Sequence, residues 1–154
     1  PLVDKHAKNG DPKAFEFAKP RIAGYDYSFS GLKTSILYFL EKQQKTDANF
    51  IHDHLDDLCA SIQSTIIDIL FHKLIKAAAD LGIKEIAIAG GVSANSGLRS
   101  ELNRLALENR WTVHVPRFEY CTDNAAMIAI TGRYMFEQGL FAEQSIAPVA
   151  RMPI

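Results

Sequence analysis

The longest periodic pattern of apolar residues in the chain runs from Phe50 to Leu81. Apolar side chains recur there at spacings of three and four residues, which is typical of one face of an α-helix. Gly82 follows directly and is well placed to end the helix, because glycine readily adopts the left-handed conformation of a helix C-terminus. A helix of about thirty residues is long for a globular protein, so we expect a break or kink within residues 53–57. The residues of the pattern are Leu55, Leu58, Cys59, Ile62, Ile66, Ile69, Leu70, Leu74 and Ala78.

Shorter patterns predict the other elements. Residues 1–24 show no clear period and predict mostly loop, with a short helix at the start. Aromatic and polar residues alternate over 25–31, which predicts a strand that ends at a glycine turn. The further elements expected are a helix at 32–43, strands at 84–89 and 111–115, helices at 95–109 and 124–138, and an irregular tail.

The order strand, helix, strand, helix after residue 84, with short connections, predicts a βαβ unit with parallel strands. We therefore expect an α/β fold in which helices cover a sheet. A single domain over residues 1–154 is the simplest organisation, because no repeat or low-complexity segment divides the chain. The two strands should be adjacent or nearly so, and the long helix should pack on one face of their sheet through Ile62, Ile66 and Leu70.

Composition and charge are ordinary for a globular protein of 154 residues, since 47% of the residues are hydrophobic and 23% are charged. The 17 basic and 18 acidic side chains give a formal net charge of −1, which offers no support for nucleic-acid binding. No apolar run approaches the roughly 18 residues of a membrane span, and no signal peptide opens the chain. Two cysteines are too few for a disulfide framework, which favours a cytoplasmic protein without membrane association.

A pair of glycines, Gly90 and Gly91, follows the strand expected at 84–89. The pair matches neither the P-loop nor the dinucleotide-binding pattern, because the further glycines of both are missing. It still lets a backbone approach a ligand closely, and the helix that starts near Asn95 would direct free N–H groups to the same place. The alternative is a tight turn in which Asn95 or Ser93 is only the helix N-cap.

Asp123 stands just before the helix expected at 124–138. It can be the N-cap of that helix or a metal or phosphate ligand, because loops after the strands of open α/β sheets carry much of their chemistry. Cys121 has no obvious histidine partner, and no HExxH motif of a zinc protease is present in the sequence. His52 and His54 lie two residues apart on a helix and would point to nearly opposite sides, which argues against a shared metal ion.

Three linked segments carry a resemblance to a known family: DYSFSGLKT at 26–34, AGGVSANSGLR at 89–99 and CTDNAAMIA at 121–129. In their order, their spacing and the long helix between the first two, the chain resembles the C-terminal half of the bacterial tRNA adenosine threonylcarbamoyltransferase family. That family was earlier labelled O-sialoglycoprotein endopeptidase, or glycoprotease. The resemblance covers essentially the whole chain and implies one lobe of the actin-like ATPase fold, which is ribonuclease H-like, with the N-terminal lobe missing.

Members of this family transfer a threonylcarbamoyl group from an adenylate to the exocyclic nitrogen of a tRNA adenosine next to the anticodon. The resemblance implies that Gly90 and Gly91 face the nucleotide, which is threonylcarbamoyl-adenylate or ATP/ADP. Asn95 would hydrogen-bond the adenylate, and Asp123 would ligate a divalent metal ion, iron or zinc. The implied partners are tRNA, the missing N-terminal lobe, a paralogous heterodimer partner and a small ATPase of the threonylcarbamoyl-transfer complex.

The family's two metal-binding histidines, its first phosphate loop and its further acidic nucleotide contacts are expected to lie before the start of this chain. We therefore expect the isolated chain to be inactive and to lack a tight metal site. Three alternatives stay open: a protease, as in the older label, a sugar-kinase or chaperone-like ATPase lobe, and a non-catalytic partner subunit. Retention of Asn95 and Asp123 disfavours the partner subunit, and no chemical role follows for Ser28, Ser30 or Lys33.

Overall fold

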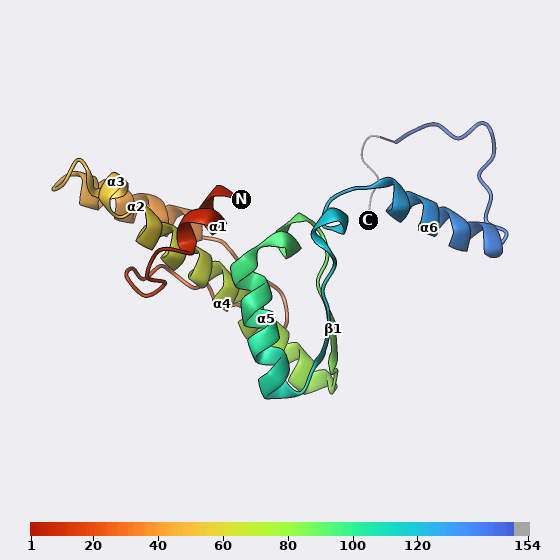
Figure 1. Cartoon of the computed structure of the whole chain (residues 1–154), viewed down its shortest axis with the longest axis horizontal. Helices are drawn as coiled ribbons and strands as arrows, with labels where there is room; N and C mark the ends of the chain where they lie inside the picture. The colour runs from red at the N-terminus through yellow and green to blue at the C-terminus, as the bar shows by residue number, and fades with distance from the viewer. Residues whose placement is uncertain (150–154) are drawn as a thin grey trace. The chain divides into compact units, whose positions relative to one another are not determined.

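The computed structural model describes residues 1–149, and Figure 1 shows the course of the chain. The chain forms two compact units, Pro1–Cys121 and the residues from Thr122 on, and each is described by itself. The described part is mostly helical and contains one small sheet. Its elements are α1 (Leu2–Ala7), α2 (Leu32–Gln44), α3 (Phe50–Asp53), α4 (Leu55–Leu81), β1 (Glu85–Ala87), η1 (Gly91–Ala94), α5 (Ser96–Asn109), β2 (Thr112–His114), η2 (Phe118–Tyr120) and α6 (Ala125–Glu137).

The two strands of the first unit pair in parallel, with Ile86 of β1 opposite Val113 of β2. Parallel neighbours need a crossover connection, and α5 supplies it here. Figure 1 shows α5 running beside the two strands that it connects. The predicted adjacency of the strands is confirmed. Because each strand has only three residues, this βαβ unit is compatible with the predicted actin-like lobe but too small to identify it.

A first core cluster lies between α4, α5 and the sheet. Its centre is Leu102 of α5, whose side chain has no exposed surface, and Ile86 brings β1 into the same cluster. Leu70 of α4 and Val113 of β2 are partly buried against it. The buried members are Phe71, Ala78, Ile86, Leu98, Leu102 and Leu105. This cluster fixes α5, and with it the turn that precedes α5, on the sheet.

A second core cluster joins the N-terminal segment and α2 to the first half of α4. Its buried members are Phe17, Leu32, Phe50, Leu58 and Ile69. Ile62 and Ile66 pack against this cluster, so the prediction that they face the sheet is wrong, whereas Leu70 does pack against the sheet cluster. The reason is length: the 27 residues of α4 span about 40 Å, whereas a three-residue strand covers about 10 Å. Only the C-terminal half of α4 can lie against the sheet.

The break and the C-terminal end predicted for the long helical segment are both confirmed. His54 separates α3 from α4 with φ −116° and ψ 22°, inside the expected break. Gly82 ends α4 with φ 67°, the left-handed conformation that glycine adopts without a steric penalty. The short helix expected near the N-terminus is α1.

The strand predicted over 25–31 is wrong. These residues form a turn and an extended segment, and Tyr25, Tyr27 and Phe29 are exposed. A strand requires a neighbour for its backbone hydrogen bonds, and the strands of the described residues, β1 and β2, pair with each other. The glycine turn at the end of the segment is confirmed, because Gly31 has φ 82° and leads directly into α2.

One helix, α4, is long and apolar enough to cross a membrane by length and composition. Half of its apolar window is buried inside the protein, which is also a property of the core helices of soluble proteins. The window is interrupted by Lys73, a buried residue whose Nζ donates to the carbonyl oxygens of Ile22 and Gly24 at 2.5 and 2.8 Å. These contacts show that α4 is a core helix of the first unit.

Candidate functional site

The glycine turn between β1 and α5 has an open surface. Gly90 has φ 78°, which other residues rarely adopt, whereas Gly91 begins η1 without such a requirement. A Cβ atom added at either position would meet no atom within 4 Å. The contacts of this chain therefore give no steric reason for glycine at 91, and the space above the pair is available to a ligand.

The turn is closed by a buried serine. Ser93 is 2% exposed, and its hydroxyl donates to the carbonyl oxygen of Gly90 at 2.6 Å. This bond links the two ends of the turn through a buried side chain.

Asn95 is the N-cap of α5. This was one of the two roles that the sequence analysis left open for the residue. Its Oδ1 accepts a hydrogen bond from the backbone N–H of Leu98 at 2.8 Å. Its Nδ2 donates to Oε1 of Gln63 on α4 at 2.7 Å. The amide nitrogen has two hydrogens, so one remains for another acceptor. The N-cap role and a role in ligand binding are therefore compatible.

A carboxylate from α1 occupies the start of α5, which the sequence did not predict. Asp4 accepts hydrogen bonds from Ser96, from the backbone nitrogen at 3.1 Å and from the hydroxyl at 2.8 Å. Burial favours the neutral form of Asp4, but the bonds from Ser96, a bond from the backbone of Gly97 and the charge of Lys8 outweigh it and lower its pKa. The prediction that free N–H groups at this helix start point to a ligand is therefore wrong, because Asp4 accepts from Ser96 and Gly97 and Asn95 accepts from Leu98.

We expect the Asp4→Asn variant to be less stable than the wild-type chain near neutral pH by about 1 kcal/mol, the order of one hydrogen bond. The pKa of Asp4 lies below its ordinary value of 3.8, so its stabilisation is complete above that value and is lost as the pH falls through the folded-state pKa. Chemical unfolding of both proteins over this range should show their stability difference shrinking on acidification. A difference that does not vary with pH would contradict the role of the Asp4 charge.

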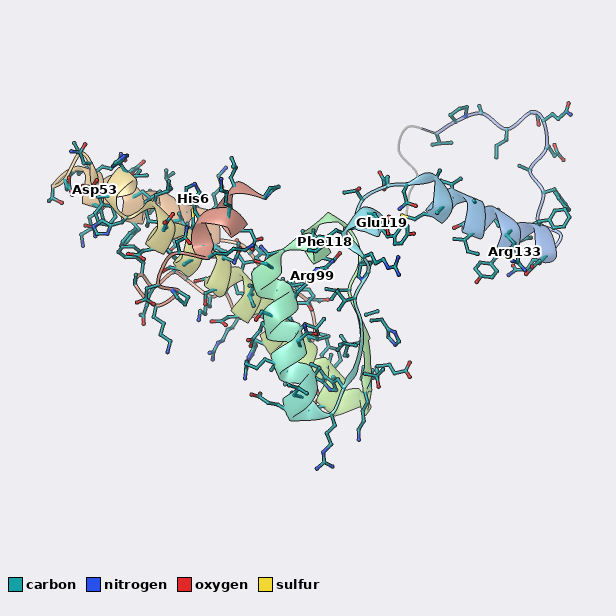
Figure 2. All side chains as sticks on the ribbon, in the orientation of Figure 1. His6, Asp53, Arg99, Phe118, Glu119 and Arg133 are labelled. Carbon is teal, nitrogen blue, oxygen red and sulfur yellow. The ribbon has the colours of Figure 1, made fainter. Side chains whose placement is uncertain are left out.

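Arg99, in the first turn of α5, contacts both sides of the turn region. Its Nε donates to the carbonyl oxygen of Ser93 at 2.5 Å, and one terminal nitrogen donates to the carbonyl oxygen of Pro116 at 2.8 Å. The same nitrogen lies 3.2 Å from Sγ of Cys121. Figure 2 shows the guanidinium beside Phe118, whose ring centroid lies 4.2 Å away.

Asp123 lies in the second unit, before α6, and is exposed. The interpretation of Asp123 as the N-cap of α6 is wrong. Asn124 is the N-cap, and its Oδ1 accepts from the backbone N–H of Met127 at 3.1 Å. Asn124 is the better placed residue because it directly precedes the first helical residue, Ala125, and its side chain reaches the third. The carboxylate of Asp123 is left available for a ligand.

No group of three or more His, Cys, Asp or Glu side chains that could hold a metal ion occurs within residues 1–149. His52 is exposed and pairs with its neighbour Asp53 at 2.8 Å, whereas the ring of His54 lies 4.6 Å from that of Phe50, centroid to centroid. The exposed carboxylate of Asp123 could occupy one coordination position of a divalent ion.

Comparison with known proteins finds the same family by two routes, a family model and individual relatives. Residues 1–130 match the family described as tRNA N6-adenosine threonylcarbamoyltransferase. A protein of that name from Riemerella anatipestifer is 55% identical over 151 residues, which are 98% of this chain and 44% of the relative. The corresponding protein from Porphyromonas gingivalis is 52% identical over 154 residues, which are 100% of this chain and 45% of the relative. The one from Fervidobacterium nodosum is 45% identical over 141 residues, 90% of this chain and 41% of the relative. The chain thus spans less than half the length of these relatives.

Proposed function

Because the chain belongs to the tRNA N6-adenosine threonylcarbamoyltransferase family, we propose that it is the C-terminal, nucleotide-binding part of a tRNA-modifying acyltransferase. The complete protein would move a threonylcarbamoyl group from threonylcarbamoyl-adenylate to the exocyclic nitrogen of a tRNA adenosine next to the anticodon. The observation that carries the proposal is the open glycine turn beside Asn95, since no contact within the described residues requires glycine at 91. The fold would be one lobe of the actin-like ATPase superfamily.

The adenylate would bind at the turn through the backbone, a side-chain amide and a carboxylate. The backbone at Gly90 and Gly91 is open to close approach, and the remaining amide hydrogen of Asn95 suits an oxygen or ring-nitrogen acceptor. The carboxylate of Asp4 repels a phosphate but accepts well from hydroxyl donors, so it suits the ribose. Asp4 lies at the start of α5 and would be an acidic nucleotide contact within this chain, whereas the sequence analysis expected such contacts to lie before it.

The metal ion, iron or zinc, would take Asp123 as one ligand. When bound, such an ion polarises a carbonyl or phosphoryl oxygen. The protein residues contribute mainly by holding the reacting groups close together, which can supply much of the rate acceleration of a group transfer. Catalytic zinc sites commonly have three protein ligands, whereas Asp123 is the one ligand that we assign within the described residues. We therefore propose that the chain alone neither holds the ion tightly nor catalyses the transfer.

The remaining partners follow from the same proposal. The N-terminal lobe would supply the histidine ligands and the first phosphate loop, and tRNA would be the acceptor. A paralogous heterodimer partner and a small ATPase would complete the assembly in the cytoplasm.

The test is threonylcarbamoyl transfer to tRNA by a full-length protein that contains this segment, measured beside the isolated chain. We expect modified tRNA from the full-length protein together with its partners and none from the isolated chain. We also expect the isolated chain to lose added zinc or iron on dialysis, because one carboxylate binds a divalent ion weakly. Stoichiometric metal retained by the isolated chain would contradict the shared site. Peptide hydrolysis without tRNA modification would favour the protease of the older family label.

A further inference from the structure

We propose that Arg99 is a positioning residue that locks the nucleotide turn to the segment leading to Asp123. This inference rests on the proposed function, because that function gives both segments their roles. Arg99 is not assigned a contact with the adenylate or with the metal ion. It acts through the backbone, with one guanidinium bound to the carbonyl oxygens of Ser93 and Pro116.

The position of Arg99 is electrostatically unusual. It lies in the first turn of α5, where the helix dipole disfavours a positive charge. The charge is compensated by two backbone carbonyls from different segments and by the ring of Phe118. A planar guanidinium can bind both carbonyls at fixed angles while its face lies on the ring, which the point charge of a lysine cannot reproduce.

Each of the two segments held by Arg99 is followed along the chain, within two residues, by one of the proposed site residues. Ser93 lies in η1, two residues before Asn95. Cys121 lies two residues before Asp123, is 2% exposed, and its Sγ lies 3.2 Å from the guanidinium of Arg99. The segment from Pro116 to Cys121 is therefore folded around the same side chain that holds the nucleotide turn.

Loss of Arg99 would leave every proposed ligand contact chemically intact but free to shift. Misplacement of about 1 Å in reacting groups lowers rates on the order of 100-fold. Since binding groups remain, kcat should fall more than KM rises. This pattern differs from loss of a binding group, which mainly raises KM.

The experiment compares three variants of the full-length protein: Arg99→Met, Arg99→Lys and, as a matched control, Arg104→Met. Arg104 lies on the same helix, but its partners are Glu101 and Glu108 of α5 itself. The readouts are kcat and KM for transfer to tRNA, and the rate at which Cys121 is alkylated by iodoacetamide. Mass spectrometry of peptides reads Cys121 separately from the second buried cysteine, Cys59, which serves as an internal control for global unfolding.

We expect Arg99→Met to lower kcat on the order of 10- to 100-fold and Arg99→Lys to lower it less, with Arg104→Met close to the wild type. Alkylation of Cys121, but not of Cys59, should accelerate on the order of 10- to 100-fold in Arg99→Met, because the segment that buries Cys121 loses a charge-assisted hydrogen bond and opens more often. If Arg99→Met also exposes Cys59, the variant is globally unfolded and Arg99→Lys becomes the test. We then expect Arg99→Lys to show faster alkylation of Cys121 and a lower kcat than the wild type.

Two results would overturn the inference. In the first, Arg99→Met and Arg99→Lys match Arg104→Met in both kcat and Cys121 alkylation. In the second, Cys121 becomes reactive while kcat is unchanged, which would make the contact purely structural. If the wild-type protein itself does not modify tRNA, the proposed function fails and the positioning role fails with it. The alkylation data would then still show whether Arg99 holds the segment in place.

Discussion

The Asn95→Asp variant of the full-length protein is expected to bind threonylcarbamoyl-adenylate about 2- to 30-fold more weakly and to unfold at nearly the wild-type temperature. Aspartate caps a helix as well as asparagine, so the bond to the N–H of Leu98 is kept. The amide hydrogens of Asn95 are lost, and a negative charge is added where the proposed anionic adenylate would bind. Gln63 can rotate its amide to donate to the new carboxylate, so its bond to position 95 is retained in reverse.

Two controls separate capping from binding. Asn95→Ala loses the cap and the ligand contact together, so stability should fall by about 1 kcal/mol in addition to the loss of affinity. Asn124→Ala removes the equivalent cap of α6, whose Oδ1 accepts from Met127, and should cost similar stability without the change in adenylate affinity. Calorimetric titration with the adenylate and thermal unfolding of all three variants provide the measurements. Normal affinity in Asn95→Asp would remove Asn95 from the nucleotide site.

The features that were predicted correctly from the sequence depend on residues that are close to one another in the sequence. The break at His54, the C-cap at Gly82 and the cap at Asn95 are each decided by conformations within a few residues, and all are confirmed. The parallel pairing of β1 and β2 follows from the short crossover through α5. The three linked motifs gave the family correctly, and the match over residues 1–130 confirms it.

The parts that sequence could not predict depend on distant segments. Asp4 and Ser96 are 92 positions apart, and no local pattern shows that a carboxylate from α1 reaches the start of α5. The sequence analysis did not single out Arg99, although a cation in a first helical turn was a usable signal. The alternating pattern at 25–31 resembled a strand, but the described residues offer no strand to pair with it. Local propensity was overridden by the absence of a partner.

The Asp123→Ala variant of the full-length protein is expected to lose metal and transfer activity together, with little change in unfolding temperature. A carboxylate that ligates a metal contributes at least as much as the groups that orient such ligands, whose loss costs about 10- to 100-fold in metal affinity or activity. We therefore expect the transfer rate to fall by at least about 100-fold at limiting metal. Stability should be nearly unchanged because Asn124, not Asp123, caps α6.

The measurements are metal content by elemental analysis, the transfer rate with and without added zinc or iron, and thermal unfolding. Asp123→Asn keeps the shape but is a weaker ligand, so partial recovery of rate at high metal concentration is expected for it and not for the alanine variant. Asn124→Ala should show the reverse pattern, with lower stability and normal metal content, because its side chain holds the helix end and not the ion. If Asp123→Ala keeps its metal while losing activity, Asp123 acts on the substrate instead. If it keeps both, the carboxylate of Asp123 has no part in the metal site.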